Sequence, residues 1–157
     1  MGQKRIGWAR IKKLVNENTN QMNNPRERVT ALDGTKAVTL AEGMTYVLAG
    51  DPGSERNLTL PTVAAGARVR IVVSTKADTA GWKIIAPDSG VLKGGCLGAN
   101  TATDATAAFN SNNTSHVALQ LRADTHPGSY VDAICDGSNW IIASGIVVYT
   151  SNAPNWV

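Results

Sequence analysis

The sequence predicts an all-β domain, either an antiparallel β-barrel or a jelly-roll-like sandwich, with a short helical arm at the N-terminus. Two observations predict the β class. Strand-length segments rich in Val, Ile, Leu and Thr recur along the chain after residue 29. Turn signals built on Gly, Pro, Asp and Asn separate these segments at short intervals. Strands that are interrupted this often are typical of antiparallel sandwiches and barrels.

The candidate strands share short alternating or continuous apolar patterns. They are residues 37–40, 45–48, 57–60, 67–73, 82–85, 116–121, 129–135 and 140–148. The region from Gly94 to Thr114 has small and polar residues around Phe109 and no clear alternation, so we expect an extended surface loop there. The predicted β-domain covers residues 29–150, and residues 151–157 form a predicted C-terminal tail.

Composition limits the class of protein. The chain has 157 residues, of which 43% are apolar and 17% charged, as in a globular domain and unlike a disordered segment. No apolar stretch approaches the roughly 18 to 20 residues of a membrane-spanning helix, so we expect no membrane contact. Cys96 and Cys135 have no second Cys or His at metal-binding spacing. We therefore expect two free, buried thiols in a protein made in the cytoplasm.

The N-terminal arm, residues 1–28, is strongly basic. It holds seven basic and two acidic side chains, a net charge of +5, which leaves −2 for the rest of a chain whose total is +3. Trp8, Ile11 and Leu14 would lie along one stripe of a short helix. An Asn-rich linker follows this helix. The arm is therefore predicted to dock on an acidic partner surface, with packing against its own domain as the alternative.

Eight side chains of the arm are predicted to contact the partner. They are Lys4, Arg5, Trp8, Arg10, Ile11, Lys12, Lys13 and Leu14. Nucleic acid is a second possible partner because the arm is basic and carries an aromatic ring. The slightly acidic remainder of the chain and its 5% aromatic content argue against nucleic acid.

The patterns expected of enzymes are missing from the sequence. His116 and His126 are the two histidines, and no Gly-x-Ser-x-Gly motif supplies a nucleophile. The Asp residues lie in or next to turns, where aspartate is expected for backbone reasons, so no catalytic pair stands out. The glycines from Gly94 to Gly98 lack the Lys-Ser/Thr of a phosphate loop. The sequence therefore predicts a protein that is not an enzyme and has no cofactor or metal.

Several short motifs appear in a recognisable order. They are Thr45-Tyr46-Val47-Leu48, Leu58-Thr59-Leu60-Pro61 with Ala65-Gly66, a Gly-containing strand end from Val91 to Gly95, Pro127-Gly128-Ser129-Tyr130-Val131-Asp132, and Asp136-Gly137-Ser138-Asn139-Trp140. In this order the chain resembles the small β-barrel domains of tailed-bacteriophage virion proteins. That family includes capsid decoration (cement) proteins and some fibre and appendage modules.

The resemblance implies a structural protein that binds the outside of the capsid and strengthens the shell. Its partners would be the major capsid protein and further copies of itself, commonly in a homotrimer, and its location would be the virion surface. A core poor in large aromatic residues agrees with a need for contacts between copies. The alternative is a tail fibre, spike or appendage module that binds a host glycan or anchors to the virion.

Overall fold

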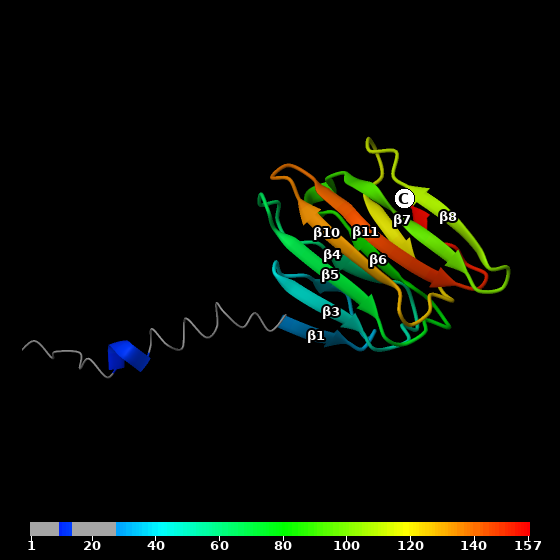
Figure 1. Cartoon of the computed structure of the whole chain (residues 1–157), viewed down its shortest axis with the longest axis horizontal. Helices are drawn as coiled ribbons and strands as arrows, with labels where there is room; N and C mark the ends of the chain where they lie inside the picture. The colour runs from blue at the N-terminus through cyan, green and yellow to red at the C-terminus, as the bar shows by residue number, and fades with distance from the viewer. Residues whose placement is uncertain (1–9, 14–27) are drawn as a thin grey trace, which may run out of the picture.

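A computed structural model describes residues 10–13 and 28–157 of the chain. Residues 10–13 are helical, and residues 28–157 form two β-sheets packed face to face (Figure 1). The prediction of an all-β, sandwich-like fold is confirmed. Within the described residues the sheets stay open and no closed barrel forms.

The larger sheet has seven strands in the order β1-β3-β5-β10-β11-β7-β8. Their bounds are β1 Arg28–Leu32, β3 Met44–Leu48, β5 Arg68–Val73, β7 Leu92–Asn100, β8 Ala105–Asn110, β10 Tyr130–Cys135 and β11 Trp140–Tyr149. The smaller sheet has five strands in the order β12-β9-β6-β4-β2. Their bounds are β2 Val38–Thr39, β4 Arg56–Thr59, β6 Trp82–Ile85, β9 Ala118–Leu121 and β12 Asn155–Trp156, and a 3-10 turn, η1, covers Pro87–Ser89.

The strand pairing is mixed, which corrects the prediction of antiparallel strands. The first six strands alternate between the two sheets, so β1, β3 and β5 pair in parallel in one sheet and β2, β4 and β6 in the other. The pair β7 and β11 is also parallel. Turns such as Asp33-Gly34 therefore carry the chain from one sheet to the other instead of closing a hairpin. A local turn signal does not distinguish these two outcomes.

The region from Gly94 to Thr114 is not the predicted surface loop, because it contains most of β7 and all of β8, paired as a hairpin. Its glycines are required by close packing. A Cβ on Gly98 would collide with the ring of Phe109, and one on Gly94 would collide with the carbonyl group of Ile142. Gly94 also has a φ of +89°, which favours glycine. Small residues here permit close strand contact, and they conceal the usual strand pattern.

The last residues of the chain belong to the sandwich and are not a free tail. Asn155 and Trp156 form β12, which pairs with β9. The backbone N–H groups of Val117 and Ala118 both donate to the carbonyl oxygen of Val157, at 2.7 and 2.9 Å. The ordered β-domain of the described chain therefore extends from Arg28 to the C-terminus.

The core lies between the two sheets and contains two fully buried tryptophans, Trp82 and Trp140. The side chain of Trp140 is completely buried. Its indole N–H donates to the carbonyl oxygen of Pro61 at 2.9 Å. Since Pro61 follows β4 of the smaller sheet, this side chain joins the two layers of the sandwich.

Candidate interaction surface

The outer face of the seven-stranded sheet is the face turned away from the core. Alternation along β5 shows how it is built: Val69, Ile71 and Val73 point into the core, whereas Arg68 and Arg70 point outward and are exposed. The same period of two operates in β10, whose Val131, Ala133 and Cys135 are buried. Side chains opposite one another on neighbouring strands share a face, so strand register fixes which residues lie together.

One line of apolar side chains crosses all seven strands on this face, and we call it the apolar row. From one edge of the sheet to the other, its members are Ala31, Val47, Val72, Tyr130, Ile146, Leu97 and Ala108. Its most exposed large members are Leu97, 52% exposed, and Ile146, 37% exposed. Apolar residues scattered singly on a surface are ordinary, whereas these seven lie next to one another across the sheet.

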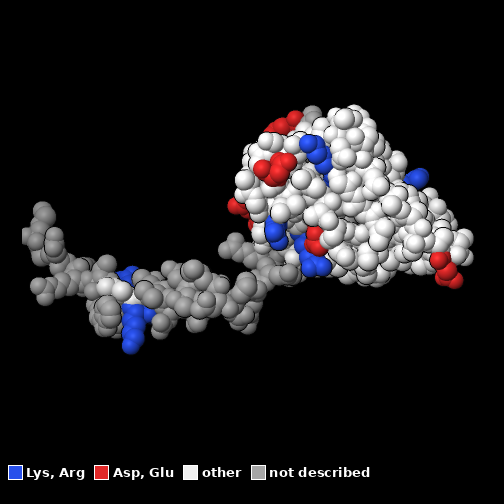
Figure 2. Space-filling model, turned by 45° about the horizontal axis from the view of Figure 1, so that its top comes forward, with Lys and Arg blue, Asp and Glu red and all other residues white. Residues whose placement is uncertain are grey.

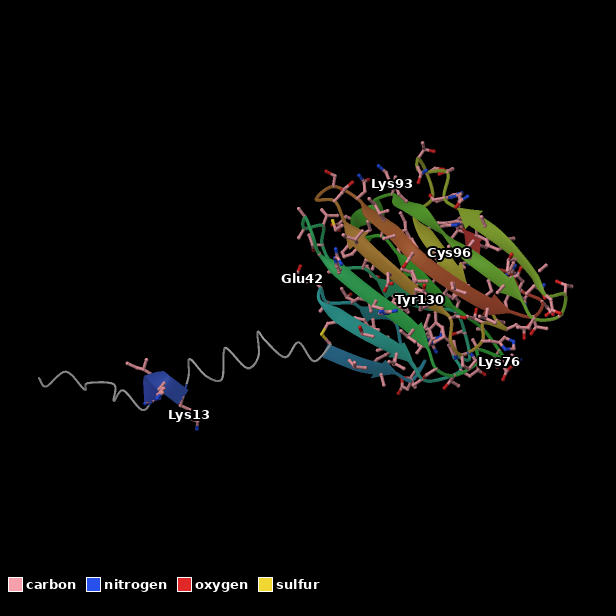
Figure 3. All side chains as sticks on the ribbon, in the orientation of Figure 1. Lys13, Glu42, Lys76, Lys93, Cys96 and Tyr130 are labelled. Atoms are coloured by element: carbon pink, nitrogen blue, oxygen red, sulfur yellow. The ribbon has the colours of Figure 1, made fainter. Side chains whose placement is uncertain are left out.

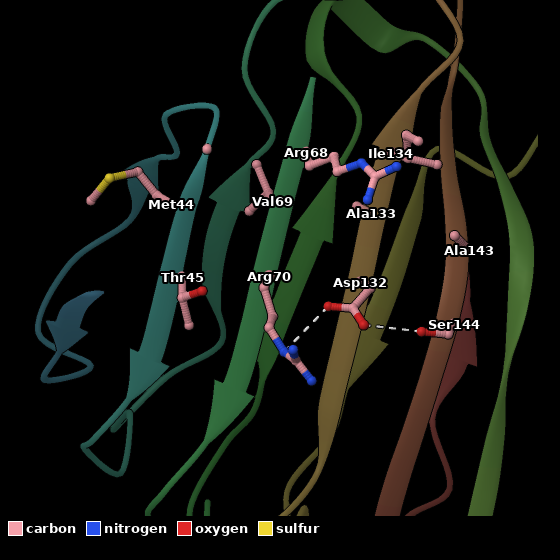
Figure 4. A pocket seen from close by; sticks show the side chains of 11 residues that line it. Met44, Thr45, Arg68, Val69, Arg70, Asp132, Ala133, Ile134, Ala143 and Ser144 are labelled. Atoms are coloured by element: carbon pink, nitrogen blue, oxygen red, sulfur yellow. Dashed lines mark hydrogen bonds and ion pairs between the residues drawn. The ribbon is translucent and has the colours of Figure 1, made fainter. Parts of the chain in front are cut away.

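A polar row lies beside the apolar row, two residues along the strands. It consists of Thr45, Arg70, Asp132 and Ser144. Arg70 Nε lies 3.4 Å from Asp132 Oδ1, and the Ser144 hydroxyl donates to Asp132 Oδ2 at 3.0 Å (Figure 4). The Arg70 guanidinium also lies over the ring of Tyr130, 5.3 Å from its centre. These contacts fix Arg70 between an anion and an aromatic ring.

The polar row lines an open groove of about 450 Å³. A β-bulge lies beside the groove: Ala133 pairs with Ile142 and Asp132 with Ser144, so Ala143, which also lines the groove, is an extra residue in β11. A bulge bends its strand and redirects the neighbouring side chains. Arg68 adds a second guanidinium to the lining, so the groove has one more positive than negative group.

Charged residues are rare over the second half of the chain. Asp104 is the one acidic or basic residue between Gly94 and Leu121, and none occurs from Gly137 to Val157. Figure 2 shows the consequence: blue and red side chains gather toward one end of the sandwich, and much of the remaining visible surface carries neither. The part of the outer face formed by β11, β7 and β8 thus combines low charge with the most exposed members of the apolar row.

The predicted arm residues are only partly within the described chain. Arg10, Ile11, Lys12 and Lys13 are helical and exposed, and Lys13 marks this helix in Figure 3. Ile11 is 39% exposed, and the predicted apolar stripe and its partner stay predictions. The other four predicted contacts, Lys4, Arg5, Trp8 and Leu14, lie outside the described residues.

Sequence reasoning did not find either row. The rows depend on the pairing of strands far apart in the chain, such as Leu97 with Ile146 and Arg70 with Asp132. One signal was visible in the sequence, namely the scarcity of charge after Gly94. That scarcity could have indicated which half of the domain has a surface suited to contact.

Both cysteines are buried and free. Cys96 lies against Gly145, whereas Cys135 pairs in register with Trp140, at the other end of β11. Five residues of strand separate these points by about 15 Å, which is too far for a disulfide. Burial raises the pKa of the Cys96 thiol to about 11, so this thiol is poorly suited to act as a nucleophile.

Each histidine has a structural contact. The ring of His116 stacks on that of Trp156 at 6.0 Å, and its Nδ1 accepts from the backbone N–H of Asn112. His126 Nε2 lies 2.7 Å from the Thr150 hydroxyl oxygen. In residues 10–13 and 28–157, no group of three or more His, Cys, Asp or Glu side chains is placed to hold a metal.

Three turn aspartates have structural hydrogen bonds. Asp136 accepts from the backbone N–H groups of Ser138 and Asn139, both at 2.7 Å, and these bonds lower its pKa. Backbone hydrogen bonds likewise lower the pKa of Asp33 and of Asp51. Asp33 and Asp136 stabilise their own turns, as expected from their positions in the sequence. Asp51 instead accepts from the backbone N–H groups of Asp78 and Thr79 and so links two loops.

No protein-family model matches the chain, and no curated protein matches it. Across the described ranges, no helix has the length and apolar character needed to cross a membrane. The fold and the outer face of the larger sheet are therefore the observations on which a function can be proposed.

Proposed function

We propose that the protein is a non-enzymatic structural protein of a tailed-bacteriophage virion, which decorates the capsid exterior and stabilises the shell. The observation that carries this proposal is the apolar row on the exposed face of the seven-stranded sheet. A broad face with low charge suits contact with another folded surface, because few charged groups must lose their water on contact. The major capsid protein is the proposed partner.

Two contributions to binding are expected. Burying Leu97 or Ile146 contributes less than the roughly 1.5 to 3 kcal/mol of a fully exposed side chain, because the two residues are already only 52% and 37% exposed. The basic arm adds electrostatic attraction to an acidic surface, and this attraction weakens as salt screens the charges. Affinity that falls only partly at high salt would agree with both contributions acting together.

The test is a titration of purified protein onto capsids that lack it. Leu97→Lys places a charge in the apolar row and should lower occupancy at least about tenfold, since the charge must be desolvated on contact. Val63→Lys is the matched control, because Val63 is 40% exposed but lies outside the row. Equal occupancy for the two variants and the unmodified chain would contradict the proposed contact face.

A second candidate function is favoured by the groove. A tail fibre, spike or appendage module that binds a host glycan would need polar side chains that engage hydroxyl groups, and Arg70, Asp132 and Ser144 provide them. The test is binding of host surface oligosaccharides to the unmodified chain and to Asp132→Asn. Binding lost in this variant, together with unchanged capsid occupancy, would favour the fibre function over decoration.

Copy number stays a prediction. Composition and the resemblance predict a homotrimer, and no observation on the described chain tests that number. Sedimentation at micromolar concentration would measure it directly.

A further inference from the structure

We propose that strand β8 pairs with β8 of a second copy of the chain, antiparallel and centred on Ala108, so that the larger sheet continues from one copy into the next. The inference names a two-fold contact between copies, and it therefore replaces the homotrimer predicted from composition and resemblance with an even number of copies. It is argued from the pairing, exposure and sequence of the edge strand β8, and it does not depend on the identity of the capsid partner.

The first step is that β8 is an unprotected edge. In the described part of the chain, β8 pairs with β7 on one side and with no strand on the other. Five of its six residues are exposed and Phe109 is half-buried. Its sequence, Ala-Thr-Ala-Ala-Phe-Asn, has no charge and no proline, and its register with β7 has no bulge. An edge of this kind offers free N–H and C=O groups to another strand.

The other sheet edges differ from β8. The smaller sheet ends in β2 and β12, which have two residues each and offer little to a partner. The opposite edge of the larger sheet is β1, which begins with the cation of Arg28. Short strands and charges are the usual means of preventing edge association. Among the edge strands of the described chain, β8 is thus the longest, and it is the one that is neither short nor charged.

The second step fixes the register. A two-fold axis perpendicular to the sheet keeps the outer face of both copies on the same side, so outward residues of β8 pair with outward residues. Ala108 is the outward residue at which the apolar row reaches this edge, opposite Leu97. When Ala108 lies opposite Ala108 of the second copy, the apolar rows of the two copies form one continuous line. If Ala107 were the central residue instead, Ala108 would lie opposite Thr106 of the other copy, and the two apolar rows would not meet.

The third step is that a second copy fits without repulsion. In the Ala108-centred register, Thr106 lies opposite Asn110 of the other copy, and Ala107 lies opposite its Phe109. Asp104 is the nearest charged residue, and it would lie opposite Asn112 of the other copy. No like charges meet, and the small side chains at the centre allow close approach of the backbones. A self-complementary, uncharged strand is the property that a two-fold contact requires.

Engineered cysteines test the contact and its register. Directly opposed residues of antiparallel strands have Cα atoms about 4.5 to 5.5 Å apart, a separation that a disulfide spans. Ala108→Cys should therefore form a covalent dimer under mild oxidation at least about tenfold faster than Ala31→Cys, its control on the β1 edge, because the paired thiols have a high effective concentration. The native thiols Cys96 and Cys135 are buried, so their background should be small.

Sedimentation of the unmodified chain provides the second measurement. A β8 pair gives dimers, or larger assemblies with an even number of copies, and Thr106→Lys combined with Ala108→Lys should weaken association at least about tenfold. A monomer or a lone trimer at tens of micromolar would overturn the inference. So would equal oxidation of Ala31→Cys, or faster oxidation of Ala107→Cys than of Ala108→Cys.

Capsid binding separates this inference from the proposed function. If the Thr106→Lys, Ala108→Lys variant loses the dimer but still binds capsids with the same occupancy, the decoration function is supported and does not require paired copies. An intact dimer that fails to bind capsids would support the β8 contact and contradict the proposed partner.

Discussion

The two halves of the sandwich, residues 28–93 and 94–157, share one core but differ in strand pairing and in charge. In the first half the chain alternates between the sheets and its strands pair in parallel, whereas in the second half hairpins join β7 to β8 and β10 to β11. The first half carries fourteen acidic or basic side chains and the second half carries five. The comparison teaches that the core does not determine the surface: two halves that share one core differ almost threefold in the number of charged side chains that they carry.

The largest expected effect concerns the bond between the halves. Trp140→Ala should lower the free energy of unfolding by about 3 to 5 kcal/mol, because it removes a fully buried ring and leaves the Pro61 carbonyl oxygen without its donor. Chemical denaturation followed by circular dichroism measures this loss. Two separate transitions in the unmodified chain, one for each half, would contradict a shared core.

The next effect sharpens the account of the second half as a closely packed hairpin region. Gly94→Ala should cost about 1 to 3 kcal/mol of unfolding free energy, because the new Cβ meets the Ile142 carbonyl group and the backbone φ is +89°. Gly53→Ala is the matched control in the first half, since nothing lies within 4 Å of its added Cβ. Equal stability of the two variants would mean that Gly94 is not confined by packing.

A smaller effect concerns acid. The pKa of Asp136 is lower in the folded chain than its ordinary value of 3.8, first through the hydrogen bond from the Asn139 backbone and then through that from Ser138. A lowered folded pKa stabilises the fold above pH 3.8, and this stabilisation is lost as the pH falls through the folded pKa. Unfolding free energy should therefore decrease below about pH 4, and Asp136→Asn should reduce this dependence on pH. An identical pH profile for the variant would contradict a structural role for this carboxylate.

The smallest effect concerns the charged pair on the outer face. Arg70→Ala should change the unfolding free energy by no more than about 1 kcal/mol, because the Arg70 side chain is 44% exposed and water screens its attraction to Asp132. Thermal denaturation at low and high salt measures the change. A loss of several kcal/mol would mean that the polar row supports the fold instead of lining a surface groove.

Sequence patterns predicted the all-β class and located strands with clear alternation, such as β5 and β10. They could not predict which strands pair, because the same turn residues serve hairpins and crossings between sheets. The hairpin of β7 and β8 could not be predicted because its small and polar residues show no clear alternation. In the fold, Gly98 makes room for the ring of Phe109. The apolar row could not be predicted, since its register depends on contacts between distant segments.

We propose that the outer face of the larger sheet, at β11, β7 and β8, is the surface by which this protein joins a virion. Electron cryomicroscopy of purified particles that carry the chain tests this claim most directly. We expect density for the sandwich on the capsid exterior, with Leu97 and Ile146 buried in its contacts. Density confined to the tail, or a sandwich on the capsid with this face turned to solvent, would contradict the account.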